Sequence, residues 1–237
     1  MLIASGIGAC YTSETMRRLE IAPSIIAANL ANLGEVIQTS EKSGADRIHI
    51  DVMDGNFVPN ITLGPGTVRA IRPLTRLPFD IHLMILQPDR YLQDFADAGA
   101  DLIIPHIEAS PDIVATVSSI HKLGKQAGVA ISPDTKVDSL RAVVNEVELI
   151  LVMSVYPGRG GQPFLEKSFS RIEDVRKLLA EEHSEAVIGV DGGITPDTVT
   201  RAAHSGATNL IAGTAIYRTR DTIREAIAEL RQAAERT

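Results

Sequence analysis

The sequence predicts an α/β protein that folds as a single (β/α)8 TIM barrel. Eight short apolar runs follow one another along the chain, and their starts lie about 27 residues apart, as successive βα units require. Amphipathic helical patterns alternate with these runs. The length of 237 residues also fits one barrel, because single α/β barrels commonly span about 200–250 residues.

The expected strands are rich in aliphatic and β-branched residues. Leu149–Ser154 begins with the run LILVM, which is apolar on both faces, as a parallel strand covered by helices should be. We expect strands at Ile21–Ile26, Arg47–Met53, Phe79–Met84, Leu102–His106, Gly128–Ser132, Leu149–Ser154, Ala186–Asp191 and Asn209–Ala212.

The helices are predicted from apolar residues three and four apart and from capping residues. Leu30–Ser43 has one such apolar face. Ser110 and Thr195 each precede a proline, and we expect them to cap helices over Pro111–Lys125 and Pro196–Ser205. The other helical segments are Glu166–Glu182, Asp221–Glu235, and the shorter Gly66–Ile71 and Val137–Glu146.

A glycine turn recurs where a helix meets the next strand, at Ser43–Asp46, Ala98–Asp101 and Ser205–Thr208. Glycine adopts the left-handed conformation of a helix C-cap at low cost. A doubly wound sheet is the alternative fold, but no G-x-G-x-x-G motif follows the first strand. We therefore expect an N-terminal extension over residues 1–20 and one barrel domain over residues 21–237.

Composition excludes several classes of protein. The net charge of −7 argues against a general nucleic-acid or anionic-membrane surface, and no apolar run is long enough to span a bilayer. The first residues make a poor secretory signal. Cys10 is the single cysteine, so no disulfide can form within the chain. These features favour a cytoplasmic protein with a small-molecule partner.

Polar side chains stand at the ends of four expected strands, where barrel enzymes place their chemistry. His49 and Asp51 share one face of the second strand, His82 ends the third and Asp191 the seventh; His106 ends the fourth. Burying these groups separately would need several compensations, whereas one divalent cation satisfies His49, Asp51, His82 and Asp191 together. Zinc accepts imidazole and carboxylate ligands, but this mixed set does not select a metal by itself, so iron, manganese and cobalt are alternatives.

Glycine-rich loops follow the last three expected strands, at Pro157–Gln162, Asp191–Ile194 and Ala212–Ala215. Backbone N–H groups approach an anion closely where no side chain intervenes, and loops after the last strands commonly bind phosphate. The candidate substrate-binding residues here are Gly158, Arg159, Gly160, Gly161, Gly192, Gly193, Gly213 and Thr214. Arg159 either adds a positive charge or points to solvent.

Three methionines, Met53, Met84 and Met153, also fall at strand ends. They either fill gaps in the core or form an apolar wall beside charge that develops on a substrate. The expected site thus combines a cation, the opposed carboxylates of Asp51 and Asp191, and loops that bind phosphate. Such a site suits a reaction in which a proton α to a carbonyl is removed from one face of the carbon and a proton is returned to the other face. The intermediate would be an enediolate stabilised by the metal.

At these residues the sequence resembles the ribulose-phosphate 3-epimerase family. The resemblance runs from Ile21 to the C-terminus. It rests on the motifs IAPSI (21–25), HIDVMDGNFVPNIT (49–62), HLM (82–84), HIEA (106–109), MSVYPGRGGQPF (153–164), VDGGI (190–194) and AGTAIY (212–217).

This resemblance implies a barrel of the ribulose-phosphate-binding type that interconverts D-ribulose 5-phosphate and D-xylulose 5-phosphate in the pentose phosphate pathway. It implies zinc or iron(II) on His49, Asp51, His82 and Asp191, with Asp51 and Asp191 as the acid/base pair. It also implies that Ser24, His82 and the glycine loops hold the substrate. Dimers or hexamers are the implied assemblies.

Two departures from the family pattern lie near the expected substrate mouth, at Tyr156 and Arg159. They keep an epimerase of D-allulose 6-phosphate, or of another ketose phosphate, as an alternative. An aldolase or decarboxylase is disfavoured, because no expected strand ends in the lysine that such enzymes use. A phosphosugar-binding module without activity is disfavoured by the intact pair of carboxylates.

Overall fold

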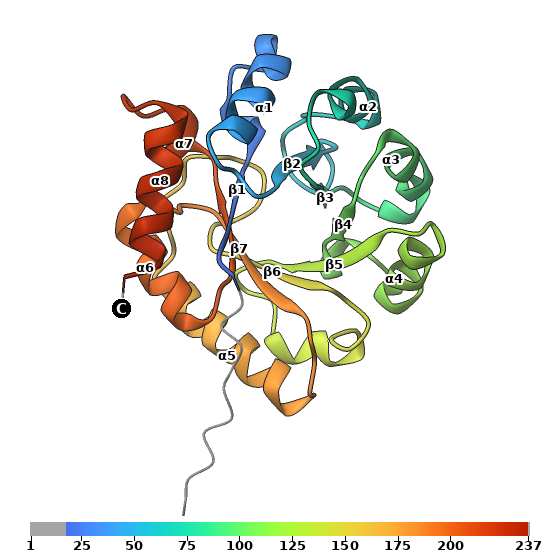
Figure 1. Cartoon of the computed structure of the whole chain (residues 1–237). Helices are drawn as coiled ribbons and strands as arrows, with labels where there is room; N and C mark the ends of the chain where they lie inside the picture. The colour runs from blue at the N-terminus through green and yellow to red at the C-terminus, as the bar shows by residue number, and fades with distance from the viewer. Residues whose placement is uncertain (1–17, 237) are drawn as a thin grey trace, which may run out of the picture.

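The computed structural model describes residues 18–236, in which eight parallel strands form a barrel surrounded by helices (Figure 1). The strands are β1 (Glu20–Pro23), β2 (Ile48–Met53), β3 (Phe79–Met84), β4 (Leu102–Pro105), β5 (Gln126–Ile131), β6 (Leu149–Met153), β7 (Val187–Asp191) and β8 (Asn209–Ala212). The paired order is β1-β8-β7-β6-β5-β4-β3-β2. A parallel bridge between Ser24 and His49 brings the ends of the sheet together. The predicted fold class is confirmed.

The helices lie outside the strands and cover the barrel (Figure 1). They are α1 (Leu33–Lys42), α2 (Pro65–Ile71), α3 (Leu92–Ala98), α4 (Ile113–Lys122), α5 (Lys167–Glu181), α6 (Pro196–Ser205), α7 (Thr214–Tyr217) and α8 (Ile223–Ala234). Short 3-10 helices are η1 (Ile25–Ala27), η2 (Leu30–Asn32), η3 (Arg72–Leu74), η4 (Pro88–Arg90), η5 (Ile107–Ala109) and η6 (Val137–Ala142). Among the described residues, no helix is long and apolar enough to cross a membrane.

Several helix starts differ from the prediction by one to three residues. Helix α4 begins at Ile113 rather than Pro111, because the Asp112 side chain accepts a hydrogen bond from the Ala115 N–H and caps the helix. Ser110, the expected cap, instead donates to the His106 carbonyl at 3.1 Å. The expected helix over Leu30–Ser43 divides into η2 and α1.

One helical segment also differs from the prediction in type and extent. The segment expected as a helix over Val137–Glu146 forms the 3-10 helix η6. The glycine turn at Gly99 indicated that a helix ends near Ala98, and α3 is this helix. The three turn glycines Gly44, Gly99 and Gly206 have φ of +93°, +108° and +126°. These positive values confirm the recurring C-cap chemistry that the sequence predicts.

Strand register determines which polar side chains meet at the carboxyl end of the barrel. In the β2–β3 pair, Asp51 is the partner of His82 and Met53 of Met84. In the β6–β7 pair, Met153 is the partner of Asp191. Because all strands are parallel, their carboxyl ends lie at one end of the barrel. The predicted extension over residues 1–20, with Cys10, falls largely outside the described residues; β1 begins at Glu20.

A buried ion pair joins β2 and β3 at the other end of the barrel. The Arg47 guanidinium donates to both Asp80 carboxylate oxygens at 2.6–2.8 Å, and the Asp80 side chain is 1% exposed. Such a pair is costly to break, because the remaining partner keeps its charge without a compensating group.

We expect Asp80→Asn to lower the free energy of unfolding by about 3 kcal/mol, because the largely buried Arg47 would then keep only its longer contact with Glu20, at 3.7 Å. Urea denaturation measures this difference. Lys177→Ala, which removes the exposed ion pair with Asp174, is the control and should change the midpoint little. Equal midpoints for Asp80→Asn and the unmodified protein would contradict the expectation.

Candidate active site

Two histidines and two aspartates meet at the carboxyl end of the barrel. Candidate ligand atoms of His49, Asp51, His82 and Asp191 all lie within 4.8 Å of one another. The His82 Nδ1 lies 2.9 Å from Asp51 Oδ1 and 3.7 Å from Asp191 Oδ2, and the His49 Nε2 lies 3.4 Å from Asp51 Oδ1. The structure thus brings together the four residues that strand-end positions indicated.

The His49 ring shows that this cluster suits a divalent cation. Its side chain is fully buried, yet neither Nδ1 nor Nε2 has a hydrogen-bond partner among the described residues. A buried polar group without a partner is rare in proteins, and many of the exceptions lie at sites that bind an ion. Two imidazoles and two carboxylates match the ligands of zinc and of first-row transition metals.

The charges in the cluster are strongly coupled. Burial, and after it the negative charge of neighbouring Asp51, raises the pKa of Asp191 to about 7. Burial opposes the charge of Asp51, but His49 and His82 outweigh it and lower the pKa of Asp51 well below its usual range. Burial lowers the pKa of His82 to about 4, although the neighbouring Asp51 carboxylate favours its charged form. Without a cation, the two carboxylates resist being ionised together.

A cavity opens beside this cluster and reaches the glycine loops. Of the predicted substrate-binding and wall residues, all except His82 line it. These are Ser24, Met53, Met84, Met153, Gly158, Arg159, Gly160, Gly161, Gly192, Gly193, Gly213 and Thr214, together with Asp51 and Asp191. The His82 side chain is 0% exposed and lies behind Asp51. The Ser24 hydroxyl donates to Asp51 Oδ2 at 2.6 Å, so it also orients that carboxylate.

The two glycines after β7 are required by both conformation and space. Gly192 and Gly193 have φ of +114° and +64°. A Cβ on Gly193 would lie 2.4 Å from the Phe164 backbone nitrogen, and one on Gly192 would lie 2.4 Å from Val155. The loops after β6 and β7 therefore pack backbone against backbone at the cavity wall, which no other residue type allows.

We expect Gly193→Ala to raise KM for a phosphorylated substrate by at least about tenfold, since a strain of roughly 1–3 kcal/mol displaces the loop. The contact with Phe164 is backbone and cannot turn aside. Steady-state kinetics measure the change. Gly66→Ala in α2 is the matched control, because its added Cβ meets nothing within 4 Å. A KM in Gly193→Ala equal to that of Gly66→Ala would refute this role.

The loop after β6 is held by its own side chains and by the β2–α2 loop. The Gln162 side-chain amide donates to the carbonyls of Tyr156 and Arg159, each at 2.7 Å. The Asn60 amide donates to the Gly158 carbonyl at 3.3 Å. Tyr156 and Gln162 both line the cavity, although neither was among the predicted site residues.

A hydrogen-bonded chain behind His82 was not predicted as part of the site. The His82 Nε2 lies 2.9 Å from the His106 Nε2, and the His106 Nδ1 lies 2.9 Å from Glu108 Oε2. The sequence signal is the spacing His-x-Glu directly after β4. It indicates a link to the cluster only once β3 and β4 are known to be neighbours.

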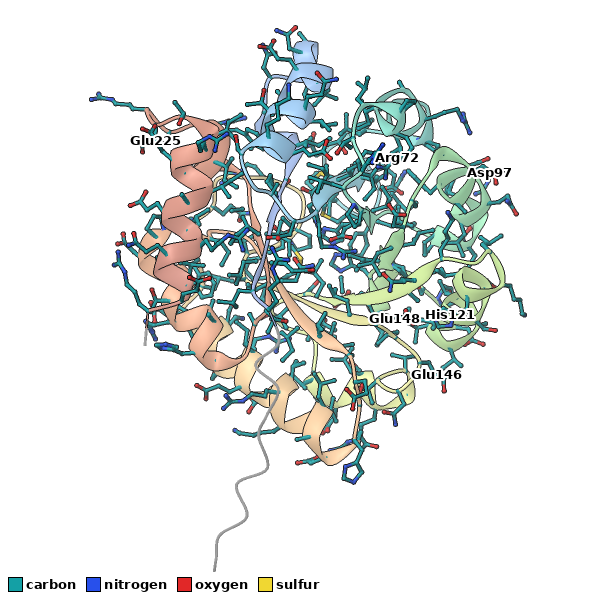
Figure 2. The ribbon with its side chains drawn as sticks, in the orientation of Figure 1. Arg72, Asp97, His121, Glu146, Glu148 and Glu225 are labelled. Carbon is teal, nitrogen blue, oxygen red and sulfur yellow. The ribbon has the colours of Figure 1, made fainter. Side chains whose placement is uncertain are left out.

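A second hollow lies at the amino-terminal ends of β6 and β7, away from the histidine–aspartate cluster. His121, Glu146 and Glu148 are among its lining residues. Figure 2 shows His121 and Glu148 close together, with the His121 Nε2 3.3 Å from Glu148 Oε2. Because the carboxyl ends of the strands carry the cavity, this hollow is not part of the candidate site.

The barrel, the buried cluster and the glycine loops at its carboxyl end define the class of phosphate-binding (β/α)8 proteins. Within that class, the chain belongs to the ribulose-phosphate 3 epimerase family, whose sequence model matches residues 20–217. The ribulose-phosphate 3-epimerase of Bacillus subtilis (strain 168) is 45% identical over 214 residues, covering 90% of this chain and 98% of that protein.

Other comparisons agree with this membership. The chloroplastic ribulose-5-phosphate-3-epimerase of Arabidopsis thaliana is 46% identical over 203 residues, covering 85% of this chain and 72% of that protein. Among solved structures, KGPDC from Streptococcus mutans superposes with a TM-score of 0.68 at 15% identity, over 91% of this chain and 99% of that one. At that identity the likeness shows the barrel fold alone.

Proposed function

We propose that this chain is a metal-dependent ribulose-phosphate 3-epimerase that interconverts D-ribulose 5-phosphate and D-xylulose 5-phosphate. The observation that carries the proposal is the pair of carboxylates, Asp51 and Asp191, which line one cavity together with three glycine loops. Membership of the family supports the choice of substrate, as do the relatives, which are named as ribulose-phosphate 3-epimerases.

Two carboxylates with opposed pKa shifts suit a two-base reaction. Asp51 is ionised and removes the proton from C3 of the ketose. The C–H electron pair then forms the C2–C3 double bond of an enediolate, and the C2 oxygen takes the negative charge. Asp191 donates its proton to the other face of C3, and the carbonyl re-forms with C3 inverted. In the reverse direction the two residues exchange roles.

The remaining residues hold and shield the reacting atoms. His49, Asp51, His82 and Asp191 would bind the cation, most consistently zinc, with iron, manganese or cobalt as alternatives. When bound, it would supply positive charge beside the substrate oxygens. Met53, Met84 and Met153 line the cavity and provide an apolar wall that strengthens electrostatic interactions at the reacting carbon. The backbone of the glycine loops would bind the distal phosphate.

The direct test is an assay with D-ribulose 5-phosphate in deuterated water. We expect D-xylulose 5-phosphate to form with solvent deuterium at C3, and metal analysis of the same preparation identifies the cation. Formation of the product with retention of the C3 hydrogen would contradict the proton-transfer mechanism. Sugar binding without any exchange would favour a binding module.

A hexulose 6-phosphate, such as D-allulose 6-phosphate, is the second candidate substrate. Tyr156 and Arg159 line the cavity and depart from the family pattern at its mouth. Specificity is the ratio of kcat/KM values for the two sugars, so both must be assayed with the same preparation. A higher value for the hexulose phosphate would replace the first proposal.

We also propose the domain limits, the assembly and the location of the protein. Residues 21–237 form the catalytic barrel, preceded by an extension over 1–20. A homo-oligomer, either a dimer or a hexamer, agrees with the prevalence of symmetric assemblies, and light scattering would give its mass. The single cysteine and the phosphorylated substrate agree with a cytoplasmic enzyme.

A further inference from the structure

Two buried histidines and a partly exposed glutamate, all outside the cavity, form a line that ends at the histidine–aspartate cluster. His82 presents its Nδ1 to Asp51 and its Nε2 to the Nε2 of His106, at 2.9 Å in each case. The His106 Nδ1 lies 2.9 Å from Glu108 Oε2. The side chains of His82 and His106 are both 0% exposed, so water cannot replace the contact between them.

The glutamate at the outer end has a fixed orientation. Glu108 Oε1 accepts hydrogen bonds from the Ser132 N–H at 2.7 Å and from the Thr135 hydroxyl. Burial alone would raise the pKa of Glu108, but its hydrogen bonds from His106, Thr135 and Ser132 lower it to about 2. Glu108 is therefore a carboxylate that only accepts hydrogen bonds, and the His106 Nδ1 must carry a hydrogen.

The hydrogen on each ring then follows from its partners. Two ring nitrogens facing each other at 2.9 Å share one hydrogen, so one donates and the other accepts. With its hydrogen on Nδ1, facing Glu108, His106 accepts at Nε2, and His82 donates from its own Nε2. The Nδ1 of His82 then has a free lone pair directed at Asp51 and Asp191.

We propose that Glu108 and His106 are positioning residues that keep the hydrogen of His82 on Nε2, so that its Nδ1 lone pair is free for the divalent cation. This inference rests on the proposed role of His82 as a metal ligand. A carboxylate or carbonyl partner on the second nitrogen of a metal-binding histidine has the same effect in other metal sites. Here the carboxylate acts through an intervening imidazole.

Glu108→Gln tests the proposal with little change of shape. The carbonyl of the introduced amide must take the Oε1 place, because the Ser132 N–H and the Thr135 hydroxyl need an acceptor there. The NH2 group of that amide then faces the His106 Nδ1 and donates to it. His106 must carry its hydrogen on Nε2 and donate to the His82 Nε2, which places the hydrogen of His82 on Nδ1, where it opposes the cation.

We therefore expect Glu108→Gln to weaken zinc affinity by about 10–100-fold, the usual range for outer partners of metal-binding histidines. Competition with a chromophoric chelator measures this affinity without reference to turnover. Thr135→Val is the matched control, because it removes one hydrogen bond to Glu108 and leaves the carboxylate facing His106. It should keep the affinity of the unmodified protein.

Nitrogen-15 NMR of the zinc-loaded, unmodified protein gives a second reading that needs no variant. We expect the His82 Nε2 and the His106 Nδ1 to be protonated and the His106 Nε2 to be unprotonated. A protonated His106 Nε2 would overturn the inference, as would equal zinc affinities for Glu108→Gln and the unmodified protein. If Thr135→Val lost as much zinc affinity as Glu108→Gln, the inference would also be overturned, because the loss would then come from a disturbed loop structure. An unmodified protein that binds no divalent cation would overturn the proposed metal site as well.

Discussion

Asn in place of either Asp51 or Asp191 should reduce kcat for epimerisation by about 10²–10⁴, the range that general acid–base catalysis contributes. Asn has nearly the same shape as Asp but cannot accept the C3 proton or return it. Both carboxylates line the cavity, and both belong to the buried cluster. Steady-state assays in both directions, with the zinc content of each variant determined, measure the loss.

Isotope exchange separates the two carboxylates. In Asp191→Asn, Asp51 can still remove the C3 proton from one epimer and return a solvent deuteron to the same face. We expect that epimer to exchange without inverting, while the other neither exchanges nor inverts. Asp51→Asn should show the reverse pattern. The asymmetry follows because each carboxylate faces one side of C3 in a two-base reaction.

The control for these variants is Asp97→Asn, which changes an exposed carboxylate on the outer helix α3 (Figure 2). It should retain full activity and exchange with both epimers. Full activity in Asp51→Asn or Asp191→Asn would remove that residue from the mechanism. If either variant exchanged the C3 hydrogen of both epimers but no longer inverted them, the two carboxylates could not each act on one face of C3.

The strands were predictable because each strand of a parallel sheet covered by helices is a short, nearly continuous apolar run in the sequence. The expected and observed bounds agree for Phe79–Met84 and Asn209–Ala212, and the other strands differ by a few residues at their ends. The side chains of His49 and Asp51 could be assigned to one face because strand residues alternate. Their meeting with His82 and Asp191 follows from the parallel order of β2, β3 and β7, which the barrel topology supplies.

What the sequence did not reveal depends on contacts between neighbouring strands. Glu108 reaches His82 only through His106, across the β3–β4 pair and the turn after β5. The pattern of residues within a single segment cannot predict a chain of hydrogen bonds that crosses several segments. The start of α4 depended on which of two nearby polar residues capped it, and it is the Asp112 side chain that accepts from the Ala115 N–H. The position of His82 behind Asp51, away from the cavity, depends on side-chain packing that strand alternation does not specify.

Removal of the cation should abolish turnover while leaving most of the affinity for phosphate. The cluster lies on β2, β3 and β7, whereas the proposed phosphate site is the backbone of the loops after β6, β7 and β8. Stabilisation of negative charge by a metal is worth several kcal/mol, which corresponds to a loss in kcat of roughly 10²–10⁴. Inorganic phosphate would bind at the distal loops, where it does not contact the cation, so its Kd should change little when the cation is removed.

Dialysis against a chelator, followed by parallel measurement of kcat and of phosphate affinity by calorimetry, tests this separation. Added zinc should restore kcat, and it should raise Tm, because a ligand that binds only the folded state stabilises it. The buried His49, which has no hydrogen-bond partner among the described residues, is the group that gains most from the cation. Gly193→Ala should give the opposite pattern, with phosphate affinity reduced and zinc affinity retained. A chelated protein that keeps its full kcat would show that the reaction does not need the cation.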